Sequence, residues 1–116
     1  MRFGIFLRRK REQSGKSMGE LARHLELSVP YVSDVERGKK PPFSSDYVKK
    51  AAGFIGVDVD LLLQAAVKTK GVFELEINNG SLDGIAAGAA LAKGWGDFDD
   101  DDFKELKKFL ESRSDN

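Results

Sequence analysis

The feature that most restricts how this chain can fold is a dense series of helix boundaries in its first third. Gly15 is a helix stop signal, and Ser17 with Glu20 three residues later has the pattern of a capping box. Ser28 offers a second N-cap soon afterwards, and Gly38 can adopt the left-handed conformation that ends a helix. Two short helices joined by a tight turn are therefore expected between the two glycines.

Apolar residues at helical spacing predict three more helices around this pair. One lies before the pair and ends near Gly15. Two follow it, the first from Ser44 or Ser45 to Gly56 and the second from Asp58 onward. The first part of the chain is thus expected to form a domain of five short helices.

The pattern changes after Gly71, which divides the chain into two expected domains, 1–70 and 71–116. Residues 73–77 alternate between apolar and acidic side chains, which predicts a short β-strand. An Ala-rich segment and a final amphipathic segment predict two further helices. The predicted fold class is therefore mainly α, with five helices, a short strand and two C-terminal helices.

Lysine and arginine gather in the first part of the chain and acidic residues in the last part. The formal net charge of the 116 residues is zero, yet residues 1–42 hold ten Lys and Arg against five Asp and Glu. Residues 71–116 hold five against eleven. A basic front half beside an acidic tail indicates that the front half faces a polyanion such as a nucleic acid.

Several other classes of protein are disfavoured by what the chain lacks. Its longest apolar stretch is shorter than the ~20 residues that a membrane-spanning helix needs. No apolar export signal follows the basic residues near the N-terminus. There is no cysteine, so neither a disulfide framework nor a thiolate zinc site can form. We therefore expect a cytoplasmic protein with no membrane partner.

Residues 17–38 resemble the helix-turn-helix of the Cro/CI-type (XRE) family of transcriptional regulators, and the resemblance extends from Leu7 to Leu63. Its motif elements are Arg11, Leu21-Ala22, Tyr31-Val32-Ser33, Val35-Glu36-Arg37-Gly38-Lys39, Pro41 and Leu62-Leu63. The resemblance implies a lambda-repressor-like domain that binds double-stranded DNA with its third helix in the major groove. It also implies an ion pair between Arg11 and Glu36 that locks this helix to the first one.

Two sets of side chains are the candidates for contacts with DNA. The base-reading candidates are Ser28, Val29, Pro30, Ser33, Asp34 and Arg37. The phosphate-binding candidates are Arg9, Lys16, Ser17, Arg23, Lys39 and Lys40. Two positions depart from the family pattern, because Glu26 stands where glycine is common and Val29-Pro30 replace the usual glutamines. Val29 and Pro30 cannot make the bidentate bonds to adenine that glutamine makes, so direct discrimination between base sequences is expected to be modest.

No group of residues has the pattern of an active site or a cofactor site. His24 is the only histidine, so it lacks a partner for a transition-metal site, and no phosphate-binding Gly-rich loop is present. The acidic residues 97 and 99–102 invite a calcium interpretation, but they lack the glycine and glutamate of an EF-hand loop. They are better placed to stabilise the start of the last helix. We expect no enzyme activity, no metal and no cofactor.

The segment 71–116 is too small to bury a core of its own, so it is expected to need a partner surface. The simplest hypothesis is a homodimer in which the strand pairs with its symmetry mate and the last two helices pack around it. The interface candidates are Phe73, Leu75, Ile77, Trp95, Phe103, Leu106 and Phe109.

The sequence therefore predicts a sequence-specific, DNA-binding transcriptional repressor that acts as a homodimer. Two alternatives stay open. In one, the chain is an antitoxin whose acidic tail binds a toxin while the first domain represses its own operon. In the other, it is a helical scaffold that binds no DNA.

Overall fold

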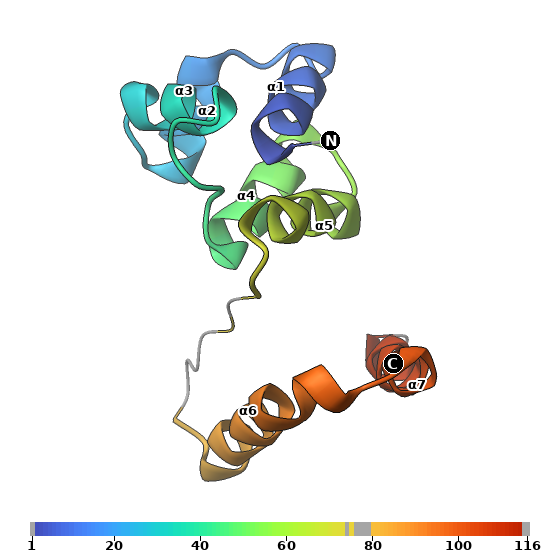
Figure 1. Cartoon of the computed structure of the whole chain (residues 1–116). Coiled ribbons are helices and arrows are strands. Elements are labelled where there is room, and N and C mark those ends of the chain that lie inside the picture. Colours follow the sequence, from blue (N-terminus) through green and yellow to red (C-terminus); the bar gives the residue numbers. More distant parts are fainter. Residues whose placement is uncertain (1, 74, 76–79, 115–116) are drawn as a thin grey trace. The chain divides into compact units, whose positions relative to one another are not determined.

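The computed structural model describes residues 2–73, 75 and 80–114. These residues form α1 (Phe3–Gln13), α2 (Met18–Leu25), α3 (Val29–Glu36), α4 (Ser45–Ile55), α5 (Val59–Lys70), α6 (Leu82–Gly94), the 3₁₀ turn η1 (Trp95–Asp97) and α7 (Asp100–Ser114) (Figure 1). The chain divides into two compact units, residues 1–75 and residues 76–116. The predicted mainly helical fold is confirmed, with five helices in the first unit and two in the second.

Helices α1 to α5 enclose one hydrophobic core. α1 packs on α3 and α5, α2 packs on α3 and α4, and α4 packs on α5. The largest fully buried side chains are Phe3, Leu7, Leu21, Leu25, Val32, Val35, Phe43, Val48 and Leu62. Phe43, from the connection between α3 and α4, meets the ring of Phe3 edge-on with 5.8 Å between the ring centroids. Since helices this short are marginal on their own, burial of their apolar faces is what holds them in place.

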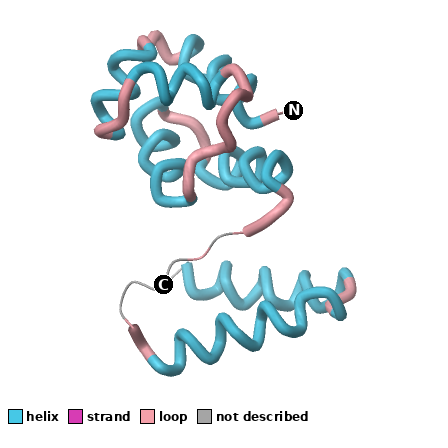
Figure 2. The backbone as a smooth tube through the Cα atoms, turned by 60° about the vertical axis from the view of Figure 1, so that its left-hand side comes forward, coloured by secondary structure: helices cyan, strands magenta, loops and turns pink. Residues whose placement is uncertain are grey.

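The predicted strand is absent from the described part of its segment. Phe73 and Leu75 have no regular secondary structure, and Ile77 lies outside the described residues. Figure 2 shows the described chain as helices joined by loops. A strand is stable only when a neighbouring strand takes up its N–H and C=O groups, and the described residues contain none. The predicted strand is therefore not seen in the described residues, and positions 74, 76 and 77 of its segment lie outside them.

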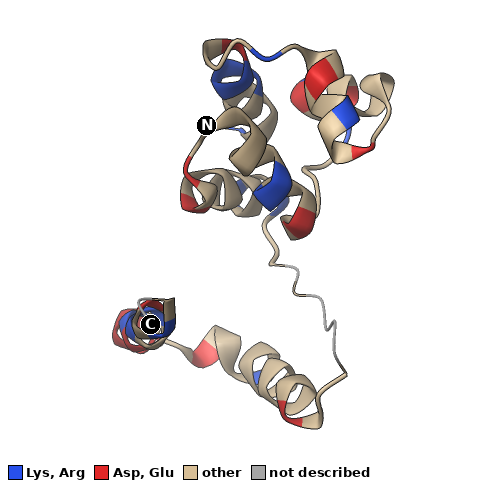
Figure 3. Cartoon of the chain, turned by 180° about the vertical axis from the view of Figure 1, so that it is seen from behind, with Lys and Arg blue, Asp and Glu red and all other residues tan. Residues whose placement is uncertain are grey.

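The described part of the second unit buries none of its side chains. α6 and α7 are joined at η1, where the rings of Trp95, Phe98 and Phe103 have centroids 4.9 to 6.1 Å apart. α6 consists of Gly, Ala, Leu and Ile apart from one Asp and one Lys, and Figure 3 shows it almost free of charge. A helix that is apolar all round normally lies buried, so α6 needs cover. Neither α6 nor any other helix of the described residues is long and apolar enough to cross a membrane.

Candidate nucleic-acid interface

α2 begins and ends with local interactions that fix the turn into α3. The Glu20 N–H donates to Ser17 Oγ (3.0 Å), and the Ser17 N–H donates to Glu20 Oε1 (3.1 Å), which completes the capping box. At the other end Glu26 has φ 57° and ψ 38°, the only positive φ among the non-glycine residues described. This conformation costs about 1–2 kcal/mol for a residue with a side chain. The Leu27 N–H then donates to the Ala22 carbonyl (2.9 Å), so the chain turns sharply into α3.

α3 turns one face inward and leaves its N-terminal end exposed. The Tyr31 N–H donates to Ser28 Oγ (3.2 Å), which caps the helix, and Pro30 occupies the first turn, where an N–H is not needed. Val32 and Val35 lie in the core. Among the base-reading candidates, Ser33 and Asp34 are half-buried, whereas the exposed ones are Ser28, Val29, Pro30 and Arg37.

A buried ion pair fixes α3 to α1. Arg11 Nε donates to Glu36 Oε2 (2.7 Å) and Arg11 Nη2 donates to Glu36 Oε1 (2.9 Å), so the contact is bidentate. Arg11 Nη1 also donates to the Lys16 carbonyl (2.9 Å). The hydrogen bonds from Arg11 to Glu36 raise the pKa of the guanidinium above its ordinary value. Only 8% and 1% of the two side chains are accessible, so removal of either partner would leave an uncompensated buried charge.

Two of the base-reading candidates pair with each other in the free chain. Arg37 Nη2 donates to Asp34 Oδ1 at 3.1 Å, and both side chains are partly exposed. A pair of this kind contributes only about 0.2–1 kcal/mol in water. It can therefore open at little cost when another partner for Arg37 arrives.

The phosphate-binding candidates beside α2 share their position with a carboxylate. Arg9 and Arg23 are exposed and Lys16 is half-buried. The Ser17 hydroxyl, however, already accepts from the Glu20 N–H. The pKa of Glu20 is lowered below its ordinary value of 4.5, chiefly because the Ser17 N–H donates to it, so the carboxylate is charged at neutral pH. The start of α2 is therefore less attractive to an anion than its N–H groups alone suggest.

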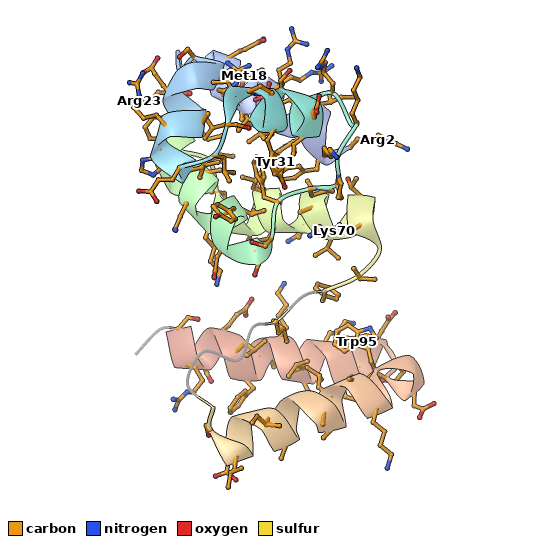
Figure 4. The ribbon with its side chains drawn as sticks, turned by 90° about the vertical axis from the view of Figure 1, so that its left-hand side faces the viewer. Arg2, Met18, Arg23, Tyr31, Lys70 and Trp95 are labelled. Carbon is orange, nitrogen blue, oxygen red and sulfur yellow. The ribbon has the colours of Figure 1, made fainter. Side chains whose placement is uncertain are left out.

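A groove of about 580 Å³ lies at the C-terminal end of α3. Lys39 and Lys40, from the connection between α3 and α4, line it. Arg2 and Lys70 line it as well, although they were not predicted as site residues. Figure 4 shows Arg2 and Lys70 on one edge of the unit and Arg23 on the opposite edge. Arg2 and Lys70 could not be predicted from the sequence, because the start of α1 and the end of α5 come together only in the folded protein.

Comparison with known proteins shows which family this geometry belongs to. A family model described as a helix-turn-helix domain matches residues 2–65. The chain belongs to this family. Two uncharacterized HTH-type transcriptional regulators of Mycobacterium tuberculosis, from strains CDC 1551 / Oshkosh and ATCC 25618 / H37Rv, are each 39% identical over 59 residues. The match covers 51% of this chain and only 41% of each relative.

Two solved structures are also similar to the chain. One is the biofilm regulator SinR in complex with DNA, with 28% identity and a TM-score of 0.48 over 53% of this chain and 97% of that one. The other is the SinR–SinI complex, with 19% identity and a TM-score of 0.49 over 98% of this chain and 99% of that one. Membership of the helix-turn-helix family confirms the predicted resemblance, and neither the family nor the names of the relatives indicate an enzyme.

The C-terminal interface candidates lie beyond the helix-turn-helix match. Those that are exposed are Phe73 (63%), Leu75 (75%), Trp95 (38%) and Phe109 (62%). Phe103 and Leu106 are half-buried, and Ile77 lies outside the described residues. The four exposed candidates therefore leave part of their apolar surface accessible.

Asp99, the residue before α7, and Asp102, in the first turn of α7, cap that helix. The Asp102 N–H donates to Asp99 Oδ1 (2.9 Å), and the Asp99 N–H donates to Asp102 Oδ2 (3.0 Å). Nowhere in residues 2–73, 75 and 80–114 do three acidic or imidazole side chains converge as a metal site requires. The arrangement is that of a helix start stabilised by negative charge.

Proposed function

We propose that this chain binds double-stranded DNA with the N-terminal end of α3 in the major groove and represses transcription as a homodimer. The observation that carries this proposal is that α3 is exposed at its capped N-terminal end while the buried Arg11–Glu36 pair holds its other end to α1. A reading helix needs this combination of exposure and fixed orientation.

The attraction for DNA comes from residues that flank the two central helices. Residues 17–38 hold two Lys and Arg against four Asp and Glu, a net charge of −2, whereas residues 1–42 as a whole hold ten against five, a net charge of +5. Cations on either side of α3 would therefore position the domain on the two DNA backbones, which carry no sequence information. Binding should weaken steeply as salt rises.

Base readout would rest on few polar groups. Val29 is 46% exposed at the start of α3 and, with Pro30, can make apolar contact with thymine methyl groups. Opening the Asp34–Arg37 pair would release an arginine for the acceptor edge of guanine and a carboxylate for the amine of cytosine. These apolar and polar contacts together predict a preference for particular base pairs. Their contribution to the binding free energy is expected to be smaller than that of the electrostatic attraction to the DNA backbone.

The test is binding of the purified protein to the DNA upstream of its own gene at several salt concentrations. The variant Arg37→Ala/Lys39→Ala/Lys40→Ala should bind more weakly and with a smaller salt dependence, by about 0.9 in the slope of log K for each lost phosphate contact. A matched control, Lys104→Ala/Lys107→Ala/Lys108→Ala, removes the same charge from α7 and should change little. Binding that is absent in the wild type, or independent of salt, would overturn the proposal.

The second unit is proposed to form the dimer. α6 and α7 contain no fully buried residue, and their exposed apolar side chains include Leu82 (83%), Ile85 (42%), Phe109 (62%) and Leu110 (55%). A second copy of the same hairpin can cover these faces with an identical surface, which is how most small homodimers close. The two helix-turn-helix domains of the dimer would then bind two half-sites on one face of the duplex.

Charge along α7 favours an antiparallel arrangement of the two copies. The apolar stripe of α7 consists of Phe103, Leu106, Phe109 and Leu110. Leu106 lies near its middle, with Asp99 seven residues before it (106 − 99) and Arg113 seven residues after it (113 − 106). If Leu106 sits on the two-fold axis, Arg113 of one copy comes level with Asp99 of the other. Opposite charges would then meet at both ends of the stripe.

This dimer is tested by light scattering on two neighbouring variants. Leu106→Gln places an amide in the apolar stripe and should shift the protein toward monomer, whereas Glu105→Gln changes the charged face of the same helix and should leave the dimer intact. An equal effect of both changes, or of neither, would contradict the dimer. If the wild type is monomeric and a small protein co-purifies with it from the native host in equal amount, the acidic second unit is the partner-binding part of an antitoxin instead.

A further inference from the structure

The ring of Tyr31, on the proposed reading helix, is held against the core of the first unit. The centroids of the Tyr31 and Phe43 rings are 6.0 Å apart, and the two rings are tilted by 54°. Phe43 is itself almost wholly buried, with its centroid 5.8 Å from that of Phe3 and 6.5 Å from that of Tyr47. Aromatic rings at these separations attract one another beyond the effect of burial alone, so the neighbours of Tyr31 fix the direction of its ring.

The other end of the same side chain is accessible and has no partner in the described part of the chain. Tyr31 is 37% exposed, although it stands four residues before the buried Val35. Within residues 2–73, 75 and 80–114, the Tyr31 N–H donates to Ser28 Oγ and the ring contacts Phe43, and the hydroxyl group takes part in neither contact. A phenol O–H can both donate and accept a hydrogen bond. This hydroxyl is therefore free to bond to a ligand.

The position of Tyr31 on α3 decides what its hydroxyl can reach. Val32 and Val35 mark the buried face of the helix, and Arg37 lies on the exposed face. Tyr31 lies at the border between the two faces, on the side of the connection that carries Phe43. A helix with its side chains is about 10–12 Å across and the major groove about 12 Å wide, so side chains at the borders of a reading helix lie against the groove walls. Those walls are the phosphate backbones.

We infer that the Tyr31 hydroxyl donates a hydrogen bond to a DNA phosphate and so helps to position α3 in the groove. Tyrosine is among the residues that bond to phosphate oxygens in protein–DNA complexes. A ring that is already held by Phe43 loses little conformational freedom on binding. Figure 4 shows Tyr31 between Arg23 and Arg2, which lie at opposite edges of the unit. As a DNA contact the inference rests on the proposed function, and it adds an uncharged aromatic donor to an interface predicted mainly from cations.

The experiment removes one oxygen atom from each of two tyrosines that contact the same ring. Tyr31→Phe deletes the hydroxyl on α3, and Tyr47→Phe deletes the hydroxyl on α4 while its ring stays beside Phe43. Duplex DNA from the upstream region is titrated into each full-length variant by fluorescence anisotropy at several salt concentrations. Tyr31→Phe should bind about tenfold more weakly than wild type, as expected for a lost hydrogen bond to a charged group, and Tyr47→Phe should bind as wild type does. The salt slope should stay unchanged in both, because an uncharged hydroxyl releases no counterion.

Two further measurements separate a phosphate contact from other roles of Tyr31. Urea unfolding should be the same for Tyr31→Phe and wild type, because the deleted hydroxyl bonds to nothing in the described chain. A loss of stability that accounts for the weaker binding would make the residue structural and overturn the inference. The loss of affinity should also be equal on the upstream duplex and on a duplex of scrambled sequence, because a phosphate contact carries no sequence information.

The remaining outcomes distinguish this inference from the proposed function. A loss confined to the upstream duplex would assign the hydroxyl to a base edge and overturn the phosphate contact. Binding by Tyr31→Phe that equals that of wild type, or an equal loss in Tyr47→Phe, overturns the inference and leaves the proposed function intact. A wild type that binds neither duplex overturns the proposed function, and the inference with it.

Discussion

The two units of this chain are both helical, yet they differ in where their apolar surface goes. α1 to α5 are short helices with a shared core, in which Phe3, Leu7 and Leu62 are wholly buried. α6 and α7 are longer, but none of the residues 80–114 is fully buried. Helix length therefore does not decide whether a unit can fold on its own. A unit folds independently when its helices can cover one another's apolar faces, and otherwise it needs another molecule to cover them.

The same contrast separates the chemistry of the two units. In the first unit, cations lie on both sides of α3, and residues 1–42 hold ten Lys and Arg against five Asp and Glu. In the second unit, charge is mixed along α7 and almost missing from α6, as Figure 3 shows. Segregated charge suits a polyanion, whereas apolar faces with mixed charge suit a protein surface. The division of labour that we propose, DNA for one unit and a second copy for the other, follows from this difference.

The largest effect is expected when the two units are separated. Residues 1–75 should unfold cooperatively on heating as a monomer, because their core is complete without the rest of the chain. Residues 76–116 in dilute solution should lack a cooperative transition and should gain helix as their concentration rises. Circular dichroism at several protein concentrations checks both. A sharp, concentration-independent transition of the second piece would remove the distinction between the units.

The features predictable from the sequence are those decided by neighbours along the chain. The capping box at Ser17, the cap at Ser28 and the α4 start at Ser44 each need only a few adjacent residues, and the helices begin where these residues stand. The pairing of Asp34 with Arg37 is also local, with the three-residue spacing that brings two side chains together on a helix. It went unpredicted, although the spacing was sufficient to find it.

What could not be predicted depends on residues that meet only after folding. The groove residues Arg2 and Lys70 stand at opposite ends of the first unit in sequence, and each alone looks like an ordinary surface cation. The strand predicted over residues 73–77 is not seen in the described part of that segment, and local alternation specifies a face but not a neighbouring strand. The long-range Arg11–Glu36 pair was expected only because the motif resembles a known family.

A smaller but still large loss of stability is expected from Arg11→Ala. It tests whether the first unit is stabilised by contacts inside that unit alone. The change leaves the Glu36 carboxylate buried and unpaired, which costs about 3–5 kcal/mol. Urea unfolding measures the loss. As a control, Arg11→Met/Glu36→Leu removes both charges and should cost much less. Self-association through the second unit should be unchanged, and a loss of dimer in the single variant would show that the units are coupled.

Gly4→Ala should destabilise the first unit by about 1–3 kcal/mol, because neither the backbone of α1 nor that of α3 can move aside easily. Gly53→Ala in α4 is the matched control. Nothing lies within 4 Å of its added Cβ, so alanine should stabilise the helix by about 0.5–1 kcal/mol. Thermal unfolding of the two variants gives the comparison. If both changes were neutral, α1 would not depend on its close approach to α3.

The smallest effect concerns the reciprocal caps that begin α2 and α7, which are alike in form but are expected to differ in consequence. Glu20→Gln keeps an oxygen that can accept from the Ser17 N–H and removes a negative charge from the start of α2. DNA binding at low salt should therefore strengthen by about two- to fivefold, as expected for one charge at an exposed helix end. Asp102→Asn removes the same charge from the cap of α7 and should leave DNA binding unchanged. Equal effects of the two changes would mean that only net charge matters.

The acid dependence of stability provides a second readout of the same substitution. The pKa of Glu20 is lowered below 4.5 by the hydrogen bonds with Ser17, so its contribution to folding is complete above that pH and is lost as the pH falls through the lowered value. Wild type should therefore lose slightly more stability than Glu20→Gln between neutral pH and the pKa of this carboxyl group, as measured by urea unfolding across that range. Parallel stability curves would show that the capping carboxylate contributes nothing to the fold.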